Sequence, residues 1–406
     1  MRIVIVSSNY LPFTGGVETH AQQVSEVLSK KHDISIAAMN FKACKLPFAF
    51  RVLHDNLLAP TEESRTEGEV RVHSISPRMV DRVVMLPTLG RVIPKLRSWY
   101  YHSINRITHP FYRFAIVPKL RRIFRGAHVV HSLAFGDLGW ASEKAARMEG
   151  CKFVCTPFAH PGQWGCGPND VSYYNRCDAV IGLVESDCAH LRSLGVDSSR
   201  IHRIGVSPNL PTHVDGTRFR QKHALGDAPL FVYVGRMMAQ KGATAVVQSA
   251  RKVWESLPDA RFVFIGPAVG SESNIFDGID PRVLYLGRVD AQEKGDALAA
   301  CDVFIMPSMS EILPTVYLEA WLLSKPVVGG LAPGLRELIE ENGAGKNVSQ
   351  DPEQIAALLD QLIREKAQCA KMGNAGKELV DRLYTTEAVA SQLESLYSRI
   401  VEKGLD

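Results

Sequence analysis

The feature that most restricts the fold is a buried strand followed by a glycine-containing loop and a helix, and it occurs twice. Residues 3–6 read IVIV, a run of β-branched side chains typical of a parallel strand buried on both faces. After the loop, apolar residues recur at helical spacing. The second series begins with a strand at Leu230–Val234 that ends at Gly235, and a helix is predicted after Gly242.

Further strand signals alternate with helical patterns along the chain. We predict these strands at Ile34–Ala38, Val129–Val130, Phe153–Thr156, Ala179–Leu183, Arg261–Ile265, Val283–Leu286, Val303–Met306 and Pro326–Val328. The alternation predicts an α/β protein with parallel, doubly wound sheets. An amphipathic helix is predicted at Glu387–Glu402.

The length of 406 residues fits two domains of roughly 200 residues each. Residues 205–216, GVSPNLPTHVDG, are rich in turn formers and predict the linker. We therefore predict an N-terminal domain over 1–207 and a C-terminal domain over 208–384.

Composition and termini exclude several classes of protein. The opening residues lack a secretory signal, and no stretch approaches the ~18 apolar residues of a membrane-spanning helix. The eight cysteines form no CxxC pair, so neither a zinc site nor a disulfide framework is expected. We predict a cytoplasmic protein with reduced thiols.

Two glycine-containing loops are candidate anion sites. Gly15 and Gly16 precede the first helix, where backbone N–H groups and the helix N-terminus favour negative charge; a plain tight turn is the alternative. Gly235-Arg236 and Lys241 follow the second-series strand. A planar guanidinium and a point-charge ammonium suit a diphosphate, and two solvated surface cations are the alternative.

Two carboxylates and a histidine complete the candidates. Glu311 and Glu319 have seven residues between them, and Pro314 and Thr315 suit the start of the helix that carries Glu319. Ligands of open α/β sheets bind at this edge, and carboxylates accept hydrogen bonds from sugar hydroxyls. His160 follows a strand and can donate to a hydroxyl or a developing charge. Ordinary exposed or helix-face acids and a structural loop histidine are the alternatives.

Together these motifs resemble retaining glycosyltransferase family 4. GGVE begins at residue 15, VGRMMAQKG spans 234–242 and SEILPTVYLEAWLLSKPVV spans 310–328, in the family's order and across nearly the whole chain. The resemblance implies the GT-B fold, two Rossmann-like domains facing each other across a cleft, with residues 385–406 packing back on the N-terminal domain. It also implies retention of configuration. Because Arg236, Lys241 and helix N-termini can stabilise the charge on the diphosphate, and the sequence offers no clear DxD-type motif, we expect a reaction that requires no metal and no cofactor.

The resemblance gives the C-terminal candidates their roles. Arg236 and Lys241, beside Gly235, match the residues that neutralise the donor diphosphate. Glu319 matches the acid that binds the ribose hydroxyls, and Glu311 matches the acid that touches the donor sugar.

Other positions match by the same resemblance. Gly287, Arg288 and Val289 match the loop whose backbone reads the base. Gly16, beside Gly15, matches the glycine that approaches the phosphates from the N-terminal side. His160 matches the histidine near the donor sugar, and we group it with Glu311, Arg236 and Lys241 as catalytic.

One loop departs from the family pattern. The family's E-G-F-G-x-P loop reads Glu311-Ile312-Leu313-Pro314-Thr315 here. Proline has no N–H, so a backbone contact to the sugar would be lost at Pro314, and we expect the Thr315 hydroxyl to replace it. Leu313, Pro314 and Thr315 stay within the predicted donor site, and the donor sugar stays open.

A basic segment indicates the acceptor. Arg78–Arg125 carries eleven basic residues and one acidic residue, Asp81, interleaved with aromatic and aliphatic side chains. This composition suits an anionic membrane surface, so we predict peripheral binding and a lipid-linked or phosphorylated glycan as acceptor. An amphipathic helical pair with a solvated face is the alternative. Nucleic acid is not expected, because no recognition motif accompanies the charge.

The predicted function is transfer of a sugar from a UDP- or GDP-sugar to an acceptor hydroxyl. A nucleotide-sugar 2-epimerase is one alternative, but it needs acid/base carboxylates near the sugar's second carbon, and we cannot place such a set. A catalytically silent nucleotide-sugar-binding protein is the other, favoured only by the altered loop at 312–315.

Overall fold

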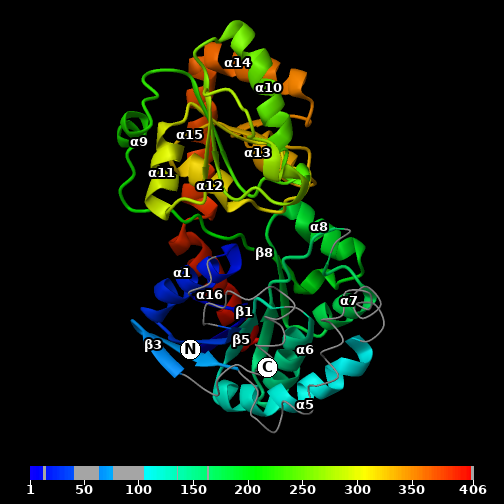
Figure 1. The fold of residues 1–406 in the computed structure, drawn as a ribbon. Coiled ribbons are helices and arrows are strands. Elements are labelled where there is room, and N and C mark those ends of the chain that lie inside the picture. Colours follow the sequence, from blue (N-terminus) through cyan, green and yellow to red (C-terminus); the bar gives the residue numbers. More distant parts are fainter. Residues whose placement is uncertain (12–14, 41–63, 76–104, 135, 162–163, 404–406) are drawn as a thin grey trace. The chain divides into compact units, whose positions relative to one another are not determined.

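A computed structural model describes residues 1–11, 15–40, 64–75, 105–134, 136–161 and 164–403 (Figure 1). The chain forms two compact units. Unit 1 comprises Met1–Gly182, Cys188–Ile204 and Val389–Asp406, and unit 2 comprises Leu183–Asp187 and Gly205–Ala388. Each unit is built around one sheet.

The sheet of unit 1 has the strand order β3-β4-β2-β1-β5-β6-β7-β8. Its strands are β1 (Arg2–Asn9), β2 (Asp33–Asn40), β3 (Ser64–Glu67), β4 (Val70–Ser74), β5 (Val129–Ser132), β6 (Lys152–Cys155), β7 (Ala179–Gly182) and β8 (Ile201–Arg203). All neighbouring pairs are parallel except β3 with β4. In the central strand β1, Ile3 pairs with Ile34 on one side and Val129 on the other.

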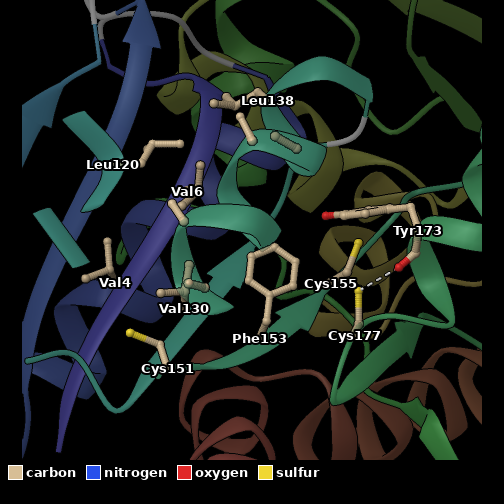
Figure 2. Packing of buried hydrophobic residues seen from close by; sticks show 14 of the residues in the cluster. Val4, Val6, Leu120, Val130, Leu138, Cys151, Phe153, Cys155, Tyr173 and Cys177 are labelled. Atoms are coloured by element: carbon tan, nitrogen blue, oxygen red, sulfur yellow. Dashed lines mark hydrogen bonds between the residues drawn. The ribbon is translucent and has the colours of Figure 1, made fainter. Parts of the chain in front are cut away.

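Helices cover both faces of this sheet, which explains the uninterrupted apolar run in β1. They are α1 (Gly16–Ser29), α5 (Asn105–Phe124), α6 (Gly136–Met148), α7 (Pro168–Tyr174), α8 (Glu185–Ser193) and α16 (Thr386–Glu402). On one face, Val4 and Val6 share a core with Leu120 of α5 and Leu138 of α6 (Figure 2).

The opposite face of β1 is covered by the first and last helices of the chain. Ile3 and Ile5 share an apolar cluster with Val24 of α1 and with Leu393 and Leu396 of α16. Glu394 adds contacts from α16 to the end of α1: its carboxylate lies 3.2 Å from Lys31 Nζ and 3.0 Å from His32 Nε2. The C-terminal helix therefore belongs to unit 1, as predicted.

The sheet of unit 2 is parallel throughout and has the order β11-β10-β9-β12-β13-β14. Its strands are β9 (Leu230–Val234), β10 (Arg261–Ile265), β11 (Val283–Gly287), β12 (Val303–Met306), β13 (Val327–Gly329) and β14 (Gly345–Asn347). Its helices are α9 (Gly216–Lys222), α10 (Ala243–Ser256), α11 (Ala291–Ala300), α12 (Thr315–Leu322), α13 (Leu335–Ile339), α14 (Pro352–Arg364) and α15 (Lys366–Leu383).

The strand order of unit 2 reverses between β9 and β12. The chain adds β10 and β11 on one side of β9 and then crosses to the other side to form β12. Such a reversal opens a crevice at the carboxyl ends of the two strands, and ligands of doubly wound sheets bind there. The loops after β9 and β12 are those that carry Arg236, Lys241 and Glu311.

The structure confirms the α/β class, the two Rossmann-like, largely parallel sheets and each predicted strand, within three residues at the ends. It adds β3, β4, β8 and β14, which were not predicted. The seven cysteines in the described ranges are free thiols. No helix of the described part is both long enough and apolar enough to span a membrane.

Candidate functional site

The loop after β9 is held in shape by backbone contacts. The Gly235 N–H donates to the Ile265 carbonyl at 2.9 Å, and a 3₁₀ turn over Ala239–Lys241 closes the loop. Gly242 then takes a left-handed conformation, φ 77°, where a Cβ would lie 2.7 Å from Cγ of Pro307. Glycine is required at this position, and it allows α10 to begin at the next residue.

The two predicted cations of this loop differ in their surroundings. Lys241 Nζ forms an ion pair with Glu311 Oε1, and the side chains are only 21% and 12% exposed. Ser308 Oγ also lies 3.3 Å from the same Glu311 oxygen. Arg236 is exposed, and among the described residues its guanidinium has no ion-pair partner. The structure thus joins Lys241 and Glu311 and leaves Arg236 available for an anion.

Tyr233, in β9, supports this loop from the core. The side chain is 1% exposed, and its hydroxyl lies 3.2 Å from the Arg236 carbonyl oxygen and 3.5 Å from that of Lys241. Burial, with the nearby Glu311 and Glu272 carboxylates, raises the pKa of Tyr233 far above its usual value. The hydroxyl therefore stays protonated and donates to the loop.

Glu319 lies in α12 and is 3% exposed. Its oxygens lie 2.7 Å and 2.8 Å from Lys294 Nζ, and Oε1 accepts from the Asn209 N–H at 3.3 Å. Lys294 Nζ also donates to the Asn209 carbonyl at 3.2 Å. Burial raises the pKa of Glu319, and Lys294 acts in the opposite direction. The acid assigned to the ribose is thus linked to α11 and to the linker.

The apolar side chains of the altered loop before α12 are buried. Ile312 and Leu313 are each 7% exposed, so Leu313 would reach a ligand through its backbone. Pro314 caps α12 in an extended conformation without a side-chain hydrogen bond, and the helix begins at Thr315 as predicted. Thr315 is partly exposed.

At the end of β11, Gly287 has φ 62°, and its carbonyl accepts from the Gly266 N–H at 2.7 Å. Arg288 is exposed and Val289 is half-buried. These residues follow the outermost strand on the β10 side of the sheet, two strands from β9. The parallel order places this loop at the same sheet edge as Lys241 and Glu311.

Unit 1 carries the remaining predicted residues at the carboxyl edge of its own sheet. Gly15 caps α1 and is exposed, as is Gly16, at which a Cβ would meet no atom within 4 Å. His160 follows β6, and its backbone pairs with Trp164 in both directions at 3.0 Å and 3.3 Å. That these residues and those of unit 2 serve one site stays a prediction.

Beneath this edge lies a buried polar group that the sequence did not indicate. His131 Nδ1 lies 2.7 Å from the Tyr397 hydroxyl, and His131 Nε2 lies 2.8 Å from Thr156 Oγ1. Burial lowers the pKa of His131 to about 3 and that of His20 to about 4. Both imidazoles are neutral in the folded protein, and the group ties α16 to strands β5 and β6.

Comparison with known proteins identifies a family that part of the chain matches. The family described as glycosyl transferases group 1 matches residues 215–379, which lie within unit 2. This part of the chain, less than half of its length, is what matches the group 1 glycosyltransferases. The prediction of a glycosyltransferase is confirmed at this level.

Curated relatives extend the match beyond unit 2. A GDP-mannose-dependent alpha-(1-6)-phosphatidylinositol monomannoside mannosyltransferase of Mycobacterium tuberculosis is 26% identical, with 97% of each chain covered. The sulfoquinovosyl transferase SQD2 of Arabidopsis thaliana is 30% identical over 44% of this chain, and that match spans 35% of the plant protein.

A solved structure shares the fold of the whole chain. HepE of Anabaena, crystallised with UDP-glucose, matches with a TM-score of 0.68 and 15% identity, covering 98% of this chain and 100% of that one. The likeness to this GT-B enzyme confirms the fold class.

The basic segment lies partly outside the described residues, which exclude Arg78, Arg82, Arg91, Lys95 and Arg97. The described cations of this segment include side chains with intramolecular partners. Arg121 Nε lies 2.6 Å from Glu149, and the Arg113 guanidinium lies over the Trp140 ring at 5.1 Å. Lys119 is buried. These three side chains contribute to the packing of α5 on the rest of unit 1.

In the described part of the chain, no cluster of three or more His, Cys, Asp or Glu side chains could hold a metal ion. Three residues near the predicted site were missed from the sequence: Tyr233, Lys294 and Ser308. Lys294 reaches Glu319 from another helix, 25 positions away. Tyr233 and Ser308 each lie three residues from the predicted residue that they support, but their contacts depend on the path of the loop, so no motif marks them.

Proposed function

We propose that this protein transfers a sugar from a UDP- or GDP-sugar to an acceptor hydroxyl with retention and without a metal. The observation that carries the proposal is the pairing of Lys241 with Glu311 beside Arg236, at the point where the strand order of unit 2 reverses. A crevice at a strand-order reversal is where doubly wound sheets bind nucleotides.

The charges fit a diphosphate leaving group. An ammonium has three N–H donors, so Lys241 can keep Glu311 and still donate to a phosphate oxygen. Arg236 adds a second cation, and the N-terminus of α10, which has no side-chain cap, adds a partial positive charge. These groups stabilise the negative charge that grows on the diphosphate as the glycosidic bond breaks.

Glu311 suits recognition of the sugar. One of its oxygens is engaged by Lys241 and Ser308, and the other can accept from a sugar hydroxyl. In the reaction we propose, the bond from the anomeric carbon to the diphosphate breaks while the acceptor oxygen bonds to the same face. The acceptor proton passes to a diphosphate oxygen, so no protein base is assigned.

We further propose a lipid-linked or phosphorylated glycan as the acceptor, at an anionic membrane surface and on the cytoplasmic side. A relative named for a phosphatidylinositol monomannoside acceptor supports this proposal. Co-sedimentation with vesicles of phosphatidylcholine and phosphatidylglycerol at low salt tests it. Binding only to the anionic vesicles supports the membrane surface, and no binding to either removes it.

The main test is a thermal-shift screen against UDP, GDP and ADP, followed by turnover with the corresponding sugars. At a hundredfold excess over its Kd, a ligand adds roughly 2.7 kcal/mol of stability. We expect one nucleotide to stabilise the protein, and Lys241→Ala to abolish that effect. Lys252→Ala is the matched control, because Lys252 pairs with Glu353 at 3.3 Å on the exposed side of α10.

Turnover separates the candidate functions. Nucleoside diphosphate released only with an acceptor supports the transferase. A changed sugar without an acceptor identifies a 2-epimerase, and binding without either identifies a silent binding protein. Absence of stabilisation by any nucleotide would overturn the proposed function.

A further inference from the structure

The surroundings of Glu319 are unusual for a residue assigned to ligand binding. Its side chain is only 4% exposed, and a carboxylate offers about four acceptor positions. Lys294 takes one position on each oxygen and the Asn209 N–H takes a second on Oε1, so three are occupied. One position remains, on Oε2, whereas a ribose diol presents two hydroxyls.

We propose that Lys294 is a positioning residue for nucleotide recognition: it holds the Glu319 carboxylate in its ionised form and in a fixed orientation, and the Asn209 contact is the one that the ribose displaces. The inference deepens the proposed function and rests on it. Of the three contacts, that of Asn209 is the longest and involves an uncharged donor, so it is the easiest to exchange for a hydroxyl.

Lys294 has no evident substitute in this role. In the described part of the chain it is the charged side chain that contacts Glu319, and it reaches α12 from α11. Burial by itself favours a neutral carboxyl group, which binds a hydroxyl more weakly than a carboxylate does. Lys294 also holds the Asn209 carbonyl at 3.2 Å, so the linker segment that the ribose would displace stays close to the site.

A purely structural role for the pair makes a different prediction. If Lys294 and Glu319 only fasten α11 to α12 and to the linker, their loss lowers stability and weakens all nucleotides equally. If Lys294 prepares Glu319 for the ribose, its loss weakens the ribonucleotide and leaves the 2′,3′-dideoxy analogue almost unaffected. The ratio of the two dissociation constants therefore separates the roles.

The experiment measures, by titration calorimetry, the Kd of UDP, GDP and ADP and of their 2′,3′-dideoxy analogues. We expect the parent protein to prefer its ribonucleotide about tenfold or more, and Lys294→Met to reduce that preference about five- to tenfold. Lys294→Arg, which keeps the charge, should restore part of it. Lys222→Met is the matched control. Lys222 lies in α9 and pairs at 2.6 Å with Glu293 of α11, the helix that carries Lys294.

The outcomes are distinct. A preference that Lys294→Met retains overturns the inference and leaves the proposed function intact, whereas a parent protein that binds none of the nucleotides overturns both. Should Lys294→Met fail to fold, Lys294→Gln takes its place, because it removes the charge, keeps a hydrogen-bond donor and leaves Glu319 intact. An undiminished preference in that variant overturns the inference, and its loss supports it.

The pH dependence provides a second readout. On acidification the preference should be lost at a lower pH in the parent protein than in Lys294→Met. The reason is that the Lys294 charge opposes the rise that burial causes in the pKa of Glu319, and the variant lacks that charge. A variant that loses its preference at the same pH as the parent protein contradicts the role given to the Lys294 charge.

Discussion

Removal of a single buried hydroxyl, in Tyr233→Phe, tests whether the core shapes the loop that carries Arg236 and Lys241. The phenol donates to one or both of two carbonyls of this loop, at 3.2 Å and 3.5 Å, and phenylalanine fills the same volume. A neutral hydrogen bond contributes about 1 kcal/mol, so the free energy of unfolding should fall by about 1–1.5 kcal/mol. If the loop must be ordered again on binding, about 1 kcal/mol appears as a roughly fivefold weaker Kd for the nucleoside diphosphate.

The assay combines urea denaturation with calorimetric titration of the nucleotide that stabilises the parent protein. The matched control is Tyr397→Phe, which removes an equally buried hydroxyl, 2.7 Å from His131, in unit 1. Both variants should lose stability, but only Tyr233→Phe should bind the diphosphate more weakly, and the effect should be smaller for the monophosphate. Equal Kd values for Tyr233→Phe and the parent protein would refute the reasoning.

Three further predictions concern stability. Gly330→Ala should destabilise unit 2 by about 3 kcal/mol or more in urea denaturation, because the added Cβ overlaps the Ser308 carbonyl; a stable variant contradicts the packing described. Leu396→Ala should cost about 2–5 kcal/mol, because Leu396 is fully buried against β1, and near-parent stability would mean that α16 does not complete this core. Since burial lowers the pKa of His131 to about 3 and of His20 to about 4, the free energy of unfolding should be highest above pH 6.5. It should fall by up to about 1.4 kcal/mol per pH unit for each histidine toward pH 4; a flat profile would show that neither imidazole is held neutral.

The sequence was most informative where one local signal determines the structure. The apolar runs of β1 and β9 are buried on both faces, so their position is visible without knowledge of the neighbours. Pro314 and Thr315 marked the start of α12 for the same reason, since proline fixes its own backbone conformation. The loops after these strands were therefore located correctly, and Lys241 and Glu311 lie together.

The elements missed from the sequence have weak local patterns. β3 reads SRTE and alternates between exposed and half-buried positions, and β8 and β14 have three residues each. Their strand character comes from pairing with neighbours, which composition does not reveal. The supporting residues were missed for a similar reason. Lys294 and Glu319 are 25 positions apart, and nothing in the spacing indicates that one side chain covers the other.

The packing of α16 on β1 has a consequence for synthesis. Unit 1 begins with the first residues of the chain, yet its core contains Leu393, Leu396 and Ile400. Apart from five residues, unit 2 is a continuous segment, Gly205–Ala388, that leaves the ribosome before that helix. The unit that is started first is therefore completed last, and this face of β1 is covered only in part, by α1, until α16 emerges. A released chain truncated after Ala388 should present a protease-resistant unit 2 and a protease-sensitive unit 1.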